Sequence, residues 1–112
     1  MPADSKKKTI RKAIKYDEDK PRTDLLPANV LLQVAKILGY GAKKYNDYNY
    51  LQGDGLPHSK PFGATLRHMF AYWDGEDLDK ESNAHHLDHA ITELLMLKDE
   101  INRGKGKDDR KK

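Results

Sequence analysis

The chain has 112 residues, of which 37% are hydrophobic and 35% charged, and it contains no cysteine. This length fits one small domain, and no apolar run approaches the roughly 20 residues that a membrane-spanning helix needs. The lack of cysteine excludes disulfide bonds, thiolate metal sites and thiol nucleophiles. We therefore expect a cytoplasmic protein with no membrane contact.

The net charge of +3 is unevenly distributed. Residues 1–12 and 102–112 hold eleven Lys and Arg against three acids, a net charge of +8, whereas residues 13–101 hold ten against fifteen, a net charge of −5. Basic ends attract nucleic-acid phosphates weakly, although solvated charged ends are the commoner case. An acidic central region suits a divalent metal better than DNA, so we expect no nucleic-acid partner beyond weak contact through the ends.

Apolar residues at helical spacing predict three helices joined by long loops, and no alternation typical of strands is present. The predicted helices cover about 27–45, 62–73 and 83–102. The predicted fold class is all-α, a small helical bundle with long loops. Residues 1–15 and 104–112 are predicted to be basic disordered tails on either side of a single helical domain, 16–103.

The last predicted helix has apolar residues on more than one side. Its predicted buried face consists of Leu87, Ala90, Ile91, Leu94, Leu97 and Ile101. Leu95 and Met96 lie off this stripe, and three helices of this length form only a thin core. A second subunit would bury both sides, so we expect a homodimer or higher oligomer that completes the core.

Four of the five histidines fall within residues 68–89, namely His68, His85, His86 and His89. On a helix that begins near residue 83, His89 shares a face with His85 or with His86. Such a pair, completed by a carboxylate from a neighbouring segment, can hold a divalent cation. The neighbouring acids are Asp74, Glu76, Asp77, Asp79 and Glu81. The alternatives are a core hydrogen bond for His68 and acids that only favour a helix start.

A second set combines cationic side chains with tyrosine and asparagine. Lys and Arg can hold a polyphosphate, while Tyr and Asn can stack on and hydrogen-bond a base. The set comprises Lys20, Arg22, Lys43, Lys44, Tyr45, Asn49 and Tyr50. Surface lysines and an aromatic core patch would give the same pattern. No phosphate-binding glycine loop and no nucleophile elbow is present.

Four segments, taken together, carry a resemblance to a known family. They are KYDEDKPRTDLLP (15–27), GAKKYNDYNY (41–50), LRHMFAYWDGEDLD (66–79) and HHLDHAITELLML (85–97). In order and spacing they resemble the phage-type dATP/dGTP diphosphohydrolase N-terminal domain family, which is associated with MazG-like all-α nucleotide pyrophosphohydrolases. The resemblance implies an enzyme of the bacterial or phage-infected cytoplasm that splits purine deoxynucleoside triphosphates into monophosphate and pyrophosphate, with Mg²⁺ or Mn²⁺.

The same resemblance implies roles for particular residues. It implies a catalytic acid–base set of His68, Glu76, Asp77 and His89. It implies a metal-binding set of His86, His89, Glu76 and Asp77. The residues that would bind phosphate are Lys20, Arg22, Lys43, Lys44 and Arg67, and those that would contact the base or sugar are Tyr45, Asn49 and Tyr50.

The sequence departs from the MazG pattern in its carboxylates. MazG-type enzymes carry an E-x-x-E pair on one helix and an E-x-x-D pair on the next, whereas this chain has only Glu76-x-x-Asp79 and has histidines in the later helix. Imidazole is a poorer Mg²⁺ ligand than carboxylate but suits Mn²⁺, Zn²⁺ or Ni²⁺. Three readings stay open: a different metal, histidines that bind phosphate directly, or a non-catalytic protein that sequesters a signalling nucleotide.

Overall fold

A computed structural model describes residues 12–16 and 18–112 of the chain. Its helices are α1 (Ala28–Lys44), α2 (Ser59–Trp73) and α3 (His86–Asn102), with the short 3-10 helices η1 (Thr23–Leu25) and η2 (Asn49–Leu51). The described residues form no strand and only two isolated β-bridges, so the predicted all-α class is confirmed. No helix in the described part of the chain combines the length and the apolar character needed to cross a membrane.

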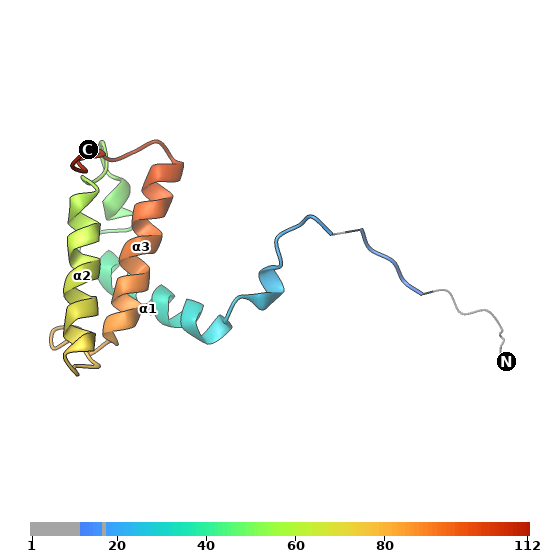
Figure 1. The fold of residues 1–112 in the computed structure, drawn as a ribbon, viewed down its shortest axis with the longest axis horizontal. Coiled ribbons are helices and arrows are strands. Elements are labelled where there is room, and N and C mark those ends of the chain that lie inside the picture. Colours follow the sequence, from blue (N-terminus) through green and yellow to red (C-terminus); the bar gives the residue numbers. More distant parts are fainter. Residues whose placement is uncertain (1–11, 17) are drawn as a thin grey trace.

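The helices α2 and α3 lie side by side and form an antiparallel pair (Figure 1). The turn that joins them lies at one end of the pair, and the C-terminus lies at the other. The helix α1 packs across α3, while its N-terminal end and the segment before it lead away from the pair (Figure 1). Most of the predicted N-terminal tail lies outside the described residues, and its residues 12–15 are exposed.

The first helix begins directly after Pro27, which occupies the capping position. Proline suits a helix start because its missing N–H has no partner to lose there. Gly39 and Gly41 interrupt the apolar pattern, yet the helix continues through both, at a cost of about 1 kcal/mol each relative to alanine. Two lysines end the helix, where positive charge is favoured by the helix dipole.

The second helix begins at Ser59, three residues before the predicted start. The Ser59 backbone N–H donates to Asp109 Oδ1 at 3.0 Å, and the Ser59 hydroxyl donates to the other oxygen of the same carboxylate. A carboxylate at a helix start satisfies free N–H groups and interacts favourably with the dipole. Because this cap comes from a residue 50 positions later, the local sequence pattern could not reveal it.

Residues 105–109, which fall in the predicted C-terminal disordered tail, make ordered contacts with the loop between α1 and α2. The Lys105 ammonium donates to the carbonyl oxygens of Leu51 and Gly53 at 2.7 and 2.8 Å. The long loop is therefore fastened at its middle to the end of the chain.

The side chain of Glu100 lies at the centre of this junction and is only 1% exposed. Its Oε1 accepts a hydrogen bond from the Leu56 backbone N–H at 2.6 Å, while Oε2 has no hydrogen-bond partner among the described residues. Gly55 and Gly106 close around it at φ +81° and +84°. A Cβ atom at these positions would lie 2.6 and 2.5 Å from the carboxylate oxygens, so the junction requires glycine at both.

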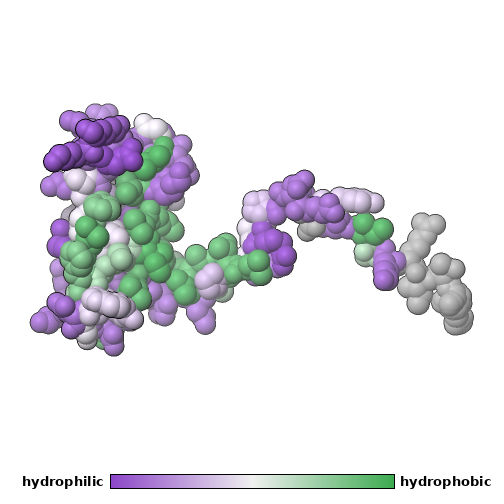
Figure 2. All heavy atoms as spheres, in the orientation of Figure 1, coloured by the Kyte–Doolittle hydropathy of each residue, from purple (hydrophilic) through white to green (hydrophobic). Residues whose placement is uncertain are grey.

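The prediction of which side of α3 is buried was largely wrong for the single chain. Of the predicted buried residues, Ala90 is buried. Four of the large apolar side chains are 36–47% exposed, namely Leu87, Ile91, Leu94 and Ile101. The inward side instead carries His86, His89, Thr92 and Glu100. His86 contacts α2, and His89 and Glu100 contact the loops, while the Thr92 hydroxyl donates to the Asp88 carbonyl oxygen within α3. Figure 2 shows hydrophobic residues gathered over the outer face of α2 and α3.

Candidate functional site

Three of the four clustered histidines meet where α2 faces the first turn of α3. His68 Nδ1 lies 2.9 Å from His86 Nδ1. The ring of His68 also stacks on the ring of His89, with 4.4 Å between centroids and 5° between planes. We call His68, His86 and His89 the histidine cluster. Two helices therefore supply three imidazoles to one place.

The fourth histidine of the window, His85, lies outside the cluster. The helix α3 starts at His86, three residues later than predicted, and His85 caps it. Its Nδ1 accepts a hydrogen bond from the Leu87 backbone N–H at 3.0 Å. Its ring lies against the Tyr72 ring, with 5.6 Å between the centroids. The predicted pairing of His85 with His89 on one helix face is therefore not formed.

The turn between α2 and α3 is folded around Asp79. Asp79 Oδ2 accepts hydrogen bonds from the backbone N–H groups of Glu81 and Ser82, at 3.1 and 2.9 Å, and from the Ser82 hydroxyl. The Ser82 Oγ lies 2.6 Å from His89 Nε2. A continuous hydrogen-bonded chain thus runs from the Asp79 carboxylate to the histidine cluster.

Asp79 also lies close enough to two of the rings to bind the same metal ion as they do. One nitrogen each of His68 and His86 and one carboxylate oxygen of Asp79 lie within 4.8 Å of one another. Asp79 is one of the acids near the histidines in sequence, but it was not among the predicted site residues. Its place as the last residue of the Glu-x-x-Asp pair was the available signal.

The two predicted acids before Asp79 contact His86 in different ways. Glu76 Oε2 lies 3.3 Å from His86 Nε2, a nitrogen that is buried and makes no geometrically good hydrogen bond with a described residue. Asp77 accepts the His86 backbone N–H with its carbonyl oxygen at 2.9 Å, while the residue itself is exposed. Glu76 therefore contacts the cluster through its carboxylate, and Asp77 contacts it through its backbone.

Burial favours the neutral form of two of the three rings, His68 and His89. It lowers the pKa of both His68 and His89, and the charge of neighbouring imidazoles acts in the same direction, whereas the Asp79 carboxylate opposes it. The positive charge of Arg67, the residue before His68, also lowers the pKa of that ring. Neutral imidazoles have free lone pairs and can bind a metal or accept a proton.

The C-terminal end of α1 reaches the same turn. The Lys44 ammonium and the Tyr40 hydroxyl both donate to Glu81 Oε2, at 2.8 and 3.0 Å. The ammonium also lies 5.4 Å from the centroid of the Tyr45 ring. Lys44, with 46% of its side chain exposed, thus offers a positive charge at the rim of the site, and Lys43 is exposed on the same helical turn.

Asn49 and Tyr50 lie in η2, far from the histidine cluster. The Tyr50 hydroxyl donates to Asp99 Oδ2 at 2.5 Å. Asp99 follows His86 by 13 residues on α3, which corresponds to about 20 Å along the helix axis. The structure therefore places the predicted base-binding residues of η2 at the opposite end of the helix pair.

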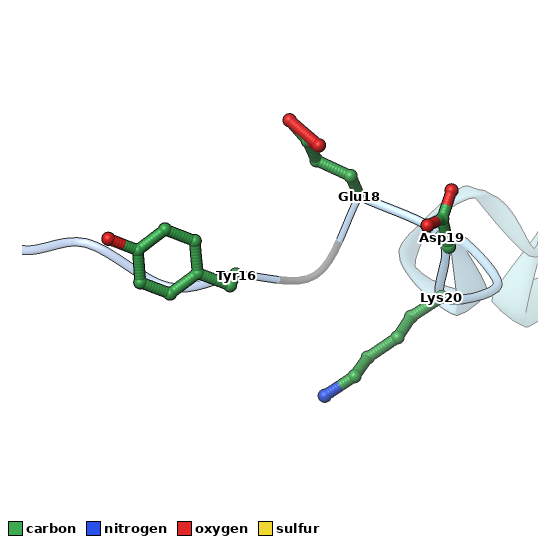
Figure 3. Close-up of a pocket in the computed structure, with 4 residues that line it drawn as sticks. All are labelled: Tyr16, Glu18, Asp19 and Lys20. Carbon is green, nitrogen blue, oxygen red and sulfur yellow. The ribbon is translucent and has the colours of Figure 1, made fainter.

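Lys20 and Arg22 lie before η1, in the segment that leads away from the helices (Figure 1). The Arg22 guanidinium is paired with Asp24 at 2.8 Å. A concavity of about 230 Å³ in this segment is lined by Tyr16, Glu18, Asp19 and Lys20. These side chains point in different directions from one extended stretch (Figure 3). The structure does not bring Lys20 or Arg22 to the histidine cluster.

The sequence profile described as "dATP/dGTP diphosphohydrolase, N-terminal" matches residues 11–110 of the chain. The chain belongs to this family. A protein of Salmonella phage PMBT28 named "dATP/dGTP diphosphohydrolase" is 30% identical over 98 residues, which are 88% of this chain and 33% of the phage protein. This member of the diphosphohydrolase N-terminal family thus spans about a third of the length of that relative. No solved structure matches the chain.

Proposed function

We propose that this domain hydrolyses dATP and dGTP to the monophosphate and pyrophosphate with the help of a divalent metal. The family and the name of the phage relative support the substrate class. The observation that carries the proposal is the convergence of two imidazoles and the Asp79 carboxylate beside a lysine at the turn between α2 and α3. Phosphoryl-type hydrolysis depends on this combination of metal ligands, proton acceptor and cations.

The residues of the site divide the work of the reaction. A divalent ion bound here would offset the negative charge of the phosphate oxygens and lower the pKa of a water molecule bound to it. His89 is kept neutral by burial and serves as the proton acceptor close to the ligands. Lys44 and Arg67, both exposed at the edge of the cluster, bind phosphate oxygens. Tyr45 lies beside Lys44, and we expect its ring to contact the base or sugar of a nucleotide whose phosphates are bound there.

The remaining predicted binding residues take no part in this proposed site within one chain. The Tyr50 hydroxyl is hydrogen-bonded to Asp99 at the other end of α3, and Arg22 lies in the segment that leads away from the helices. Asn49 shares η2 with Tyr50, and Lys20 shares the outer segment with Arg22.

Incubation with dGTP, dATP and dCTP, each with Mn²⁺ or Mg²⁺, tests the proposal directly. We expect the purine nucleotides to yield monophosphate and pyrophosphate, and dCTP to yield much less. Lys44→Ala should raise KM, because it removes a phosphate contact, while Lys36→Ala on the same helix should leave KM unchanged. The absence of product from both purine nucleotides with either metal would overturn the proposal.

A second candidate function is nucleotide binding without turnover. It is favoured by the small number of carboxylates at the cluster, where two imidazoles and one carboxylate oxygen stand in place of several carboxylates. The recovery of intact nucleotide from denatured protein, together with no product in the assay above, would support sequestration. Rapid turnover would exclude it.

We also propose that two copies of the chain associate through the outer face of α2 and α3. Among the described residues, the only buried apolar side chains are Val34, Pro61 and Ala90. The exposed apolar side chains of the outer face are Phe62, Met69, Phe70, Trp73, Leu87, Ile91, Leu94, Leu95 and Ile101. On α3, Leu87, Ile91, Leu94 and Ile101 are separated by four, three and seven residues, a spacing that places them along one side of the helix. A second copy would therefore bury the surface that the single chain leaves open.

A further inference from the structure

We propose that His68, His86 and Asp79 bind one divalent transition-metal ion at the turn between α2 and α3. This ligand set shares only His86 with the one that the family resemblance implied. It adds His68 and Asp79 and leaves out His89, Glu76 and Asp77 as ligands. In giving the ion a role in hydrolysis, the inference rests on the proposed function, but the binding of the ion can be measured alone.

The distance between the two ring nitrogens is consistent with a shared ion. His68 Nδ1 and His86 Nδ1 lie 2.9 Å apart. With metal–nitrogen bonds of about 2.1 Å, this separation corresponds to an angle of about 90° at the ion. That is the angle between neighbouring ligands of an octahedral ion, whereas a tetrahedral ion would need a separation of about 3.4 Å. The rings can therefore accept an octahedral ion with little movement.

The surroundings of His86 support binding through Nδ1. Its ring is almost fully buried, and Nε2 lies 3.3 Å from Glu76 Oε2. When Nδ1 of a neutral imidazole binds a metal, the proton must sit on Nε2. In metal sites that second N–H is commonly directed at a carboxylate, which orients the ring and increases its basicity. A small movement of the Glu76 side chain would let its carboxylate accept this N–H.

The hydrogen bonds of the turn fix one oxygen of the Asp79 carboxylate and leave the other available to the ion. Its Oδ2 accepts the hydrogen bonds that fold the turn, including one from the Ser82 hydroxyl. Within the described part of the chain, no hydrogen bond reaches Oδ1. Three protein ligands leave the remaining positions of an octahedral ion for water and phosphate oxygens.

The ligand types determine the class of ion. Two imidazoles and one carboxylate suit Mn²⁺, Ni²⁺ or Zn²⁺, whereas Mg²⁺ prefers oxygen ligands and gives up its water reluctantly. The octahedral angle further favours Mn²⁺ or Ni²⁺ over Zn²⁺, which is almost always tetrahedral in structural sites. We therefore expect a strong preference for these ions over Mg²⁺.

Isothermal titration calorimetry of the metal-free full chain, without nucleotide, measures the binding. We expect one Mn²⁺ or Ni²⁺ per chain and at least tenfold weaker binding of Mg²⁺. Asp79→Asn keeps an oxygen that can accept the hydrogen bonds of the turn, and His68→Phe keeps a ring that can stack on His89. Each should weaken Ni²⁺ binding at least tenfold. His58→Ala, at the opposite end of α2, should bind Ni²⁺ as the natural chain does.

A second measurement needs no substitution and does not depend on the folding of a variant. Addition of substoichiometric Mn²⁺ should broaden the NMR resonances of the His68, His86 and His89 rings much more than those of His58, because the His89 ring stacks on His68. Unchanged affinity in both variants, equal affinity for Mg²⁺ and Ni²⁺, or equal broadening of His58 and the three rings would each overturn the inference.

The outcomes separate this inference from the proposed function. If the ion binds at the three ligands but no nucleotide yields product, the proposed metal site is supported and the proposed hydrolase activity is contradicted. Turnover that runs equally well in Asp79→Asn and His68→Phe would leave the hydrolase standing and remove this metal site.

Discussion

Single residues hold distant parts of this chain together. Glu100 is an acidic residue on α3 with a fully buried side chain, and two glycines with positive φ make room for it. Nothing in the local pattern distinguishes it from the exposed acids of the chain, because its partner Leu56 lies 44 residues away. The glycines gave the only sequence signal, since glycine is the residue that adopts such backbone angles readily.

Replacement of Gly106 by alanine should destabilise the chain more than the same change at Gly104. Both residues have positive φ, +84° and +69°, so both variants bear the backbone cost of about 1–2 kcal/mol. At Gly106 the new Cβ would also lie 2.5 Å from Glu100 Oε2, whereas at Gly104 it would have no atom of a described residue within 4 Å. We expect Gly106→Ala to lose at least about 1 kcal/mol more in urea denaturation. Equal losses would show that the Glu100 junction is not closely packed.

The Tyr50 hydroxyl should lose its proton at a higher pH than an ordinary tyrosine. Burial, with the hydrogen bond to Asp99 and the charge of that carboxylate, raises its pKa from 10.0 to about 12. The folded chain then keeps this proton while the unfolded chain loses it, so the stabilisation is complete below pH 10 and is lost as the pH rises from 10 to about 12. Phenolate absorbance should show a late step that Tyr50→Phe removes. A wild-type chain in which every tyrosine ionises near pH 10 would contradict this assignment.

At the scale of elements, the apolar spacing predicted the existence and order of all three helices, but not two of their starts. The start of α2 depends on Asp109, and the start of α3 depends on the His85 side chain. The first cap is remote in sequence, and the second comes from a residue type that is not a common cap. The site was predicted in part for the same reason. Helical spacing left His85 and His86 as alternative partners of His89, and the family resemblance implied a role for His68. Only the packing of α2 against α3 shows that His68 meets His86, and only the folded turn adds Asp79.

His85→Ala should destabilise α3 without weakening metal binding. The change leaves the Leu87 backbone N–H without its acceptor, and the loss of a side-chain cap costs about 0.5–2 kcal/mol. His85→Asn should recover most of this loss, since asparagine is a preferred cap. Thermal denaturation monitored by circular dichroism measures the stability. Unchanged stability together with weaker Ni²⁺ binding would instead identify His85 as a ligand.

At the scale of the whole molecule, the single chain leaves an apolar face uncovered. The apolar stripe on α3 was correctly recognised as a helical pattern, but the sequence could not tell which partner it faces. In the chain alone this stripe is exposed, and Figure 2 shows hydrophobic residues over α2 and α3, whereas the polar side chains of His86, His89, Thr92 and Glu100 are buried. A leucine or isoleucine side chain that becomes buried contributes about 1.5–3 kcal/mol, so a few of them would stabilise a pair of subunits considerably.

Sedimentation equilibrium should therefore show a dimer or higher oligomer. Leu94, 47% exposed near the middle of the stripe, is the position to test. Leu94→Glu places a charge in the proposed contact and should give a monomer. Gln33→Glu adds the same charge on α1 and should leave the oligomer intact. A natural chain that stays monomeric over the accessible concentration range would rule out this surface as a self-contact.

The central claim is that imidazoles of two helices and the carboxylate of the turn form one metal and nucleotide site. Anomalous diffraction from crystals grown with Mn²⁺ and a non-hydrolysable dGTP analogue tests it most directly. The account predicts an anomalous peak between His68, His86 and Asp79, with the triphosphate bound on the side of Lys44. Mn²⁺ and nucleotide bound elsewhere, with the two facing rings still hydrogen-bonded to each other, would contradict it.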